Sequence, residues 1–308
     1  MDAHPASPST SPRPPLYRPL EAWCLVDLDG DDALSWLHGQ ITNSLKVLER
    51  GESVYALVTN TKGKILSELW VSRSESSVHL ALPKLAYEGV SAHFESFIVM
   101  EDVELQPRPD FGLVHLWGEG SADYAQEAVV TLGEGLALPL PRLSEEGWDL
   151  WLPQKRLDEL ETWLSSRASG LGHEAWESLR IARGVPQFGI DFDSRHFPQE
   201  AGLKSRGVSF TKGCYLGQEA IVMLEHRGKL PRTLMRLEIE GESPPPAGEL
   251  LCNAEAQPVG EITSSARHPQ QRERCVALAR LELKKWQPGQ ALTLAGREVR
   301  SVEALDPA

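Results

Sequence analysis

The chain has 308 residues, of which 41% are hydrophobic and 24% charged, and its formal net charge at pH 7 is −13. This is the composition of an ordinary globular protein, and no apolar run is long enough to cross a bilayer, so no membrane partner is expected. The acidic balance argues against a dedicated DNA-binding protein, because neutralising phosphates requires a broad basic surface. A chain of this length is expected to form two or three domains.

The first 19 residues hold six prolines and no hydrophobic segment. They fit neither a secretory signal nor an amphipathic, Arg-rich transit peptide, so we expect residues 1–19 to form a disordered tail. The missing export signal and the presence of only four cysteines favour the reducing cytoplasm as the compartment.

Residues 20–110 alternate between the patterns of strands and helices. The stretch DDALSWLHGQI spaces its apolar residues for one helix face. The stretch SVYALVTNTKGKILSELWVS then predicts two strands joined by an Asn-Thr-Lys-Gly turn, which is typical of a β-hairpin. Asn60 lies in this turn, either as a ligand contact or simply as a turn residue.

The second half of the chain changes character at residue 232. Before it, amphipathic helices are expected in 154–168 and 173–184. Beyond it, short alternating segments separated by Pro and Gly predict a small β-barrel or sandwich.

The cysteines do not form a metal-binding pattern. They lie far apart in the sequence, with no Cys-x-x-Cys pair and no close Cys/His cluster, so no metal ligand is predicted. Cys24 and Cys252 are interpreted as packing residues, because free cysteine is among the most buried residue types.

Cys214 has a different setting, in the stretch TKGCYLGQEAIV. Lys212 lies two residues before it, and a short helix is expected just after it; a nearby cation and a helix start both stabilise a thiolate. Gly213 and Gly217 would let backbone approach a ligand closely. The alternative is a buried structural cysteine in a Gly-rich turn.

The block from 179 to 232 resembles the YgfZ-type folate-binding proteins and the related mitochondrial iron–sulfur assembly factor, which are relatives of the aminomethyltransferase (T-protein) of the glycine cleavage system. The run Lys212-Gly213-Cys214-Tyr215, followed by Gly217-Gln218-Glu219, matches the YgfZ-type signature. Further segments that resemble the family are LRIARGVPQFGID, FPQEAGL, WLHGQITNSL and NTKGKILSEL. The resemblance covers the chain from about residue 20 to residue 308.

The resemblance implies an α+β fold of three domains arranged as an aminomethyltransferase-like ring around a central channel, with a C-terminal β-barrel domain. On this basis we expect a discontinuous folate-binding core domain at 20–50 and 140–231, an α+β domain at 51–139 and the β-barrel domain at 232–308.

The resemblance also implies tetrahydrofolate, or a reduced folate derivative, as cofactor. Segment 195–232 holds seven Lys or Arg against three Asp or Glu, which would favour the glutamyl carboxylates of a folate. Cys214 and Lys212 are the candidate catalytic residues. The candidate cofactor-binding residues are Tyr215, Gln218, Glu219, Glu200, Arg227 and Asn60.

Each of these candidates has an ordinary alternative. Gln218 and Glu219 either bond a pterin edge or cap the turn. Glu200 matches an acidic position of the transferase branch and either faces the channel or is a solvated loop carboxylate. For Arg227 the alternative is a solvated basic loop.

Two departures from the transferases bear on the activity. The transferases carry an acidic pair, including the catalytic aspartate, where this chain has Ser67-Glu68, and a glutamate near the position of Ala182, where the pterin is held. Both differences argue against a classical aminomethyltransferase.

We therefore expect a tetrahydrofolate-binding accessory protein that supports assembly or repair of iron–sulfur clusters in client enzymes, including tRNA-modifying enzymes, through a single functional cysteine. Its expected partners are folate and iron–sulfur client enzymes or assembly proteins. The alternatives are a folate-dependent one-carbon (aminomethyl-type) transferase and an interaction scaffold with an inert channel.

Overall fold

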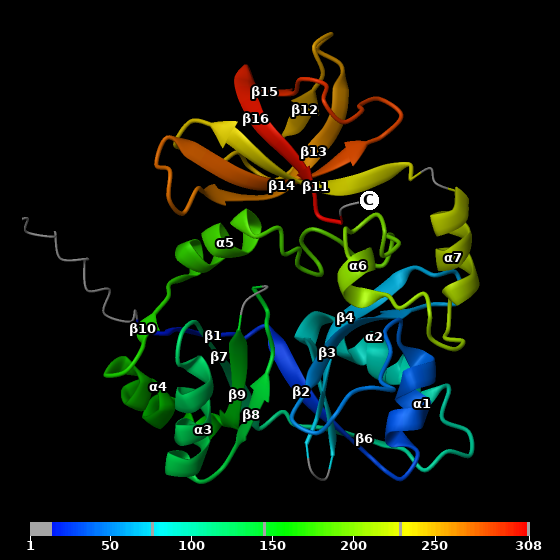
Figure 1. Cartoon of the computed structure of the whole chain (residues 1–308), viewed down its shortest axis with the longest axis vertical. Coiled ribbons are helices and arrows are strands. Elements are labelled where there is room, and N and C mark those ends of the chain that lie inside the picture. Colours follow the sequence, from blue (N-terminus) through cyan, green and yellow to red (C-terminus); the bar gives the residue numbers. More distant parts are fainter. Residues whose placement is uncertain (1–13, 75–76, 144–145, 228–229, 307–308) are drawn as a thin grey trace, which may run out of the picture.

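The computed structural model describes residues 14–306 except 75–76, 144–145 and 228–229, and it does not describe the side chain of Arg227. The protein has a mixed α+β architecture in which two five-stranded sheets lie side by side and a closed six-stranded barrel lies at one end (Figure 1). None of the helices in the described part of the chain is long and apolar enough to span a membrane.

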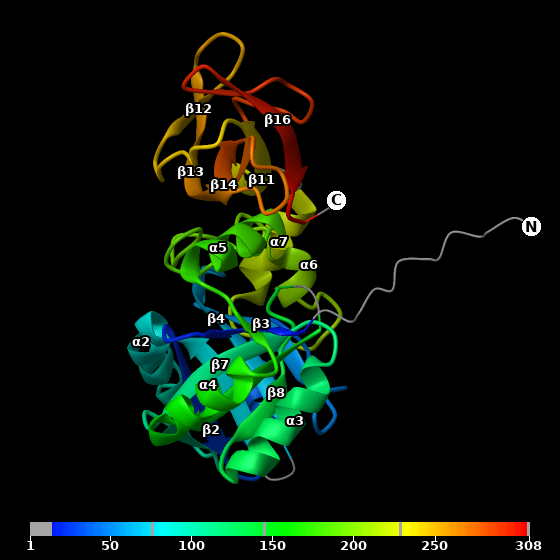
Figure 2. The ribbon, with the colours of Figure 1, turned by 90° about the vertical axis from the view of Figure 1, so that its left-hand side faces the viewer.

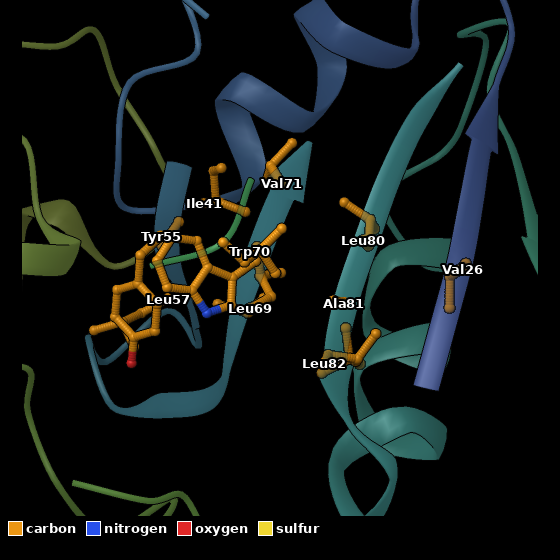
Figure 3. Packing of buried hydrophobic residues seen from close by; sticks show 14 of the residues in the cluster. Val26, Ile41, Tyr55, Leu57, Leu69, Trp70, Val71, Leu80, Ala81 and Leu82 are labelled. Atoms are coloured by element: carbon orange, nitrogen blue, oxygen red, sulfur yellow. The ribbon is translucent and has the colours of Figure 1, made fainter. Parts of the chain in front are cut away.

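The first sheet has the antiparallel order β3-β4-β5-β2-β6. Its strands are β2 (Trp23–Asp29), β3 (Ser53–Thr59), β4 (Ile65–Arg73), β5 (Val78–Pro83) and β6 (Glu104–Pro107). The helices α1 (Ala33–Gln40) and α2 (Lys84–Glu95) belong to the same part of the molecule. Figure 3 shows part of its packed core, in which apolar side chains of β2 to β5 and the residue after α1 are buried.

The predicted hairpin is confirmed, since β3 pairs with β4 around residues 60–64. Asn60 holds the turn, because its Oδ1 accepts hydrogen bonds from the backbone N–H groups of Lys62 at 2.9 Å and Lys64 at 3.1 Å. Gly63 has φ of +73°, a conformation that glycine adopts without strain.

The second sheet has the order β10-β1-β7-β9-β8. Its strands are β1 (Leu16–Pro19), β7 (Phe111–Trp117), β8 (Leu136–Pro139), β9 (Gly147–Pro153) and β10 (Ser169–Gly170). The 3-10 turn η1 (Gln154–Arg156) leads into α4 (Leu157–Ser165), which packs with α3 (Ser121–Leu132) and the sheet around a separate apolar core.

A helical segment joins the sheets to the barrel and consists of α5 (His173–Ala182), α6 (Lys204–Gly207) and α7 (Gln218–Arg227). Figure 2 shows these helices between the sheets and the barrel. Asp191 in this segment is fully buried and accepts hydrogen bonds from Thr263 Oγ1 at 2.6 Å and Ser264 Oγ at 2.7 Å, and it pairs with Arg180 at 2.7 Å. The barrel is thereby fixed to α5.

The predicted C-terminal β-barrel is confirmed. Its closed order is β11-β14-β13-β12-β15-β16. The strands are β11 (Arg232–Glu240), β12 (Leu250–Cys252), β13 (Pro258–Arg267), β14 (Arg274–Glu282), β15 (Thr293–Leu294) and β16 (Arg297–Ala304). They enclose a core of aliphatic side chains and Trp286.

Two expected domain boundaries are wrong. Leu16–Pro19 form β1, which pairs with β7 and β10, rather than the end of a disordered tail; residues 1–13 lie outside the described residues. The boundary between residues 50 and 51 divides a single sheet, because β2 pairs with β5. The expected domain at 51–139 likewise takes strands from both sheets. These pairings join segments that are distant in sequence, so local patterns carry no signal for them.

Candidate functional site

A cavity of about 320 Å³ lies where the two sheets meet the helical segment. This volume is at the lower end of the range of small-molecule sites. Aromatic and charged side chains dominate its lining: Trp23, Tyr55, Trp70, Trp176, Arg18, Arg142, Arg180, Arg206, Glu21, Glu68 and Glu177. Flat aromatic surfaces with a few fixed polar groups are suited to a planar heterocycle that carries hydrogen-bonding groups.

Glu68, on β4, supplies a buried carboxyl to this cavity. Its Oε2 accepts a hydrogen bond from Tyr55 Oη at 3.0 Å, and its Oε1 accepts one from the backbone N–H of Phe188 at 3.0 Å. Burial raises the pKa of Glu68 despite these two donors. Each carboxylate oxygen keeps a second lone pair, so the group can still accept hydrogen bonds from a ligand.

Tyr55 and Trp70 form one wall of the cavity, with ring centroids 5.3 Å apart in an edge-to-face arrangement (Figure 3). The Arg206 guanidinium lies 4.6 Å from the Tyr55 ring centroid and 5.3 Å from that of Trp70. It donates hydrogen bonds to the carbonyl oxygens of Pro141 and Arg142. Carbonyl partners do not neutralise the guanidinium, so its charge remains available to an anionic ligand group.

Another part of the cavity lining rests on a buried ion pair. Arg142 lies 3.9 Å from the Trp23 ring centroid and binds Asp149 with two nitrogens, Nε to Oδ1 at 2.9 Å and Nη2 to Oδ2 at 2.5 Å. His115 Nδ1 lies 2.8 Å from Asp149 Oδ1. Burial opposes ionisation of Asp149, yet the adjacent Arg142 and His115 hold its pKa below the usual value. Asp149 thus holds Arg142 against Trp23.

Cys214 lies elsewhere, in the loop formed by residues 211–217, which we call the signature loop. The thiol is exposed, and α7 begins at Gln218, so the helix expected after Cys214 is present. The loop lies against the β3–β4 hairpin: Thr59 Oγ1 donates to Leu216 O at 2.7 Å. Gly217 has φ of +83°, and a Cβ built on it would lie 2.4 Å from the Asn60 carbonyl oxygen. Only glycine fits there.

Lys212 takes its hydrogen-bond partners from outside the signature loop. Lys212 is buried, and its Nζ donates to the backbone carbonyls of His38, of Ile41 at 2.7 Å and of Asn43 at 2.9 Å. All three ammonium protons are therefore used at the C-terminal end of α1, where carbonyls lack helical partners. Burial lowers the pKa of Lys212 to about 8.

The other candidates also surround the hairpin and α7 rather than the cavity. Glu200 is buried, and its Oε2 accepts hydrogen bonds from Lys64 Nζ at 3.1 Å and from the backbone N–H of Phe197 at 2.9 Å. Asn60 acts as the turn residue described above. Tyr215 is buried, burial raises its pKa to about 12, and no described group bonds its Oη.

Gln218 and Glu219 occupy the first turn of α7, with Glu219 exposed, and the side chain of Arg227 lies outside the described residues. None of the predicted site residues whose side chains are described lines the cavity. The cavity and the signature loop are therefore two separate places in the structure, although the sequence predicts a single site. Among described residues, no group of three or more His, Cys, Asp or Glu side chains could hold a metal ion.

Sequence reasoning missed the residues that line the cavity. The sequence marks Glu68 only as a departure from the transferase pattern, although it supplies the buried carboxyl. Trp70 and Trp176 carry no local signal that distinguishes a cavity wall from a core. Their role appears only when β4 and α5 are brought together.

The comparisons with known proteins agree with this architecture. No family model matches the chain. A "tRNA-modifying protein YgfZ" of Yersinia pestis (strain Pestoides F) is 26% identical over 243 residues, which covers 75% of this chain and 73% of that protein. A protein of the same name from Vibrio atlanticus (strain LGP32) is 26% identical over 219 residues, covering 69% and 66%.

Among solved structures, the glycine cleavage system aminomethyltransferase T from Bartonella henselae superposes with a TM-score of 0.80 at 19% identity, over 95% of this chain and 85% of that one. The expected aminomethyltransferase-like fold is confirmed. The resemblance in sequence to the YgfZ proteins is confirmed as well.

Proposed function

We propose that this protein, which resembles the YgfZ proteins in sequence and the aminomethyltransferases in fold, binds a reduced folate in its central cavity and supports tRNA-modifying iron–sulfur enzymes. The observation that carries the binding proposal is Glu68, a buried carboxyl set among aromatic walls and arginines.

The residues of the cavity fit a folate chemically. One edge of a pterin presents adjacent N–H donors, and the unused lone pairs of Glu68 can accept from them. Tyr55 and Trp70 offer aromatic surface to the ring system. Arg18 and Arg206 offer positive charge to the glutamyl carboxylates. Bound, a reduced folate would supply nitrogens that carry one-carbon groups, while the protein binds it, orients it and limits access of water.

Cys214 is proposed to act on the surface rather than in the cavity. Its thiol is exposed and belongs to a loop whose residues do not line the cavity. An exposed thiol is accessible to a sulfur atom, a cluster or a client enzyme. The printed name of the relatives, tRNA-modifying protein, suggests clients that modify tRNA. In this proposal the folate and the thiol serve one accessory function from two places.

Aminomethyl transfer is the second candidate, favoured only by the raised pKa of Glu68 in the cavity. At the other two positions where the transferases carry acids, this chain has Ser67 and Ala182, and neither side chain is acidic. Ser67 donates its hydroxyl to the carbonyl of Glu68 at 2.7 Å, and Ala182 packs against the apolar cluster beneath the barrel. An assay of ammonia release from aminomethyl-lipoyl carrier protein with tetrahydrofolate decides: turnover supports the transferase, and no turnover supports the accessory role.

Two experiments test the proposed function. Calorimetry with tetrahydrofolate and its polyglutamates should show saturable binding, whereas no heat and no thermal shift at millimolar ligand would contradict it. In a deletion strain, the wild-type gene should restore the activities of cluster-dependent enzymes, including those that thiolate tRNA. The Cys214→Ser gene should not restore them.

A further inference from the structure

Lys212 connects the signature loop to a segment outside it. Its ammonium donates to His38 O, Ile41 O and Asn43 O, which belong to the end of α1 and the chain directly after it. Cys214 is two residues further along the loop and exposed. Among the described residues, no hydrogen bond holds the thiol itself, so the position of the loop depends on its other residues, such as Lys212.

The segment that receives Lys212 also holds a wall of the cavity. Thr42 Oγ1 donates to Gly207 O at 2.6 Å, and Asn43 Nδ2 donates to Tyr55 O at 2.9 Å and to Arg206 O at 3.3 Å. Tyr55 and Arg206 line the cavity. Residues 41–43 therefore contact both the signature loop and the cavity wall through direct hydrogen bonds.

We propose that Lys212 is a positioning residue: it fastens the signature loop to residues 41–43 and so holds the Cys214 thiol at a fixed place relative to the cavity. The proposal rests on the proposed function only in taking Cys214 as the functional thiol. It assigns to Lys212 a role through hydrogen bonds, which is distinct from the charge effect on the thiolate that the sequence suggests.

The side-chain chemistry explains why lysine is suited to this position. An ammonium carries three donors on one atom, and here three carbonyl oxygens converge on that atom. Methionine fills similar space but donates no hydrogen bond, which leaves three carbonyls without this partner. Arginine keeps the charge, but its planar fork spreads its donors and is not equivalent.

The test is amide hydrogen exchange, read separately in the signature loop (211–217) and in the barrel strands. In Lys212→Met, exchange in 211–217 should rise about tenfold or more, because a lost set of buried hydrogen bonds lowers the local opening free energy. Exchange in β14 should follow only the change in global stability. Lys212→Arg should give an intermediate increase in the loop and a near-normal melting temperature.

Leu160→Ala serves as the stability control, since Leu160 is fully buried in the separate core beside α4. The two variants are compared under conditions in which their free energies of unfolding are equal. If Lys212 contributes only to general stability, Lys212→Met and Leu160→Ala should then raise exchange in the signature loop by the same amount. That result would overturn the proposal. If Lys212→Met does not fold, Lys212→Arg decides: loop exchange equal to wild type overturns it. Hydrogen exchange is measured without folate and without a client enzyme. Failure of the Lys212 proposal can therefore be distinguished from failure of the proposed function.

Discussion

The central cavity and the signature loop are built in opposite ways. The cavity assembles Trp23, Trp70 and Trp176 from β2, β4 and α5, which are far apart in the chain. The loop is a contiguous run whose thiol is exposed. A short motif can therefore mark one candidate site in a protein while the residues of another carry no local pattern.

The two regions also differ in how they are stabilised. The cavity depends on buried charge pairs such as Arg142–Asp149, which are costly to disrupt. The loop depends on backbone fit at Gly217 and on the hydrogen bonds of Lys212. Variants in each region should therefore have separable effects, which differ in the expected size of the change in stability.

The largest effect is expected for Asp149→Ala. Removing this fully buried carboxylate leaves Arg142 buried without its partner, which should cost about 3–5 kcal/mol of unfolding free energy. Urea unfolding measures it, with Glu161→Ala on the exposed face of α4 as control. Folate binding should weaken too, because Arg142 lies against Trp23 in the cavity wall. A loss no larger than that of the control would show that the pair does not support the cavity.

The signature loop should respond to Gly217→Ala. The new Cβ would meet the Asn60 carbonyl at 2.4 Å in a backbone with φ of +83°. We expect a loss of about 2 kcal/mol, from left-handed strain and displaced backbone. Gly213→Ala is the matched control: a Cβ there has no neighbour within 4 Å, so stability should be almost unchanged. Equal effects at the two glycines would mean that the loop is not held against the hairpin.

Glu68→Gln should change the pH dependence of stability. Burial raises the folded pKa of Glu68 above 4.5, so the folded protein binds this proton more tightly than the unfolded chain does. The resulting stabilisation of the wild type is complete below pH 4.5 and is lost as the pH rises through the folded pKa. Glu68→Gln has no carboxyl to titrate and does not lose this stabilisation. Its unfolding free energy should therefore rise relative to that of the wild type as the pH increases from 4.5 through the folded pKa, by about 1.4 kcal/mol per unit of pKa shift. Urea unfolding on both sides of pH 4.5 measures it; a pH-independent difference would contradict a buried, titrating Glu68.

The smallest effect on stability is expected for Cys214→Ser. The thiol is exposed, so the unfolding free energy should change by less than about 0.5 kcal/mol. Complementation of the deletion strain should nevertheless be lost. Cys24→Ser is the control, since Cys24 is half-buried in β2 and donates to Leu82 O at 3.5 Å; it should complement. Full complementation by Cys214→Ser would show that the thiol is dispensable.

Much of the fold could be predicted, because its signals are local. The β3–β4 hairpin follows from its turn residues, and the barrel from alternating segments broken by Pro and Gly. The place of β1 could not be predicted: Leu16–Pro19 lie in a proline-rich stretch and become a strand only by pairing with β7 and β10. Long-range pairing outweighs composition there.

The candidate site was predictable only in part. The motif draws attention to Cys214, and the structure leaves this residue exposed, which a reactive thiol requires. It does not indicate the partners of Lys212, because distance along a chain does not say which way a side chain points. Its ammonium binds the end of α1, which precedes it by more than 170 residues. Glu68 became recognisable only through the contacts of Tyr55 and Phe188.

The most direct test of the central claim, that ligand binding and thiol chemistry occupy different places, is a calorimetric titration of tetrahydrofolate into three proteins: the wild type, Glu68→Gln and Cys214→Ser. We predict that Glu68→Gln weakens binding by about tenfold or more, since a charged hydrogen-bond acceptor is lost, and that Cys214→Ser binds like the wild type. Undiminished binding by Glu68→Gln, or loss of binding by Cys214→Ser, would contradict the assignment of the folate to the cavity and of the thiol to the surface.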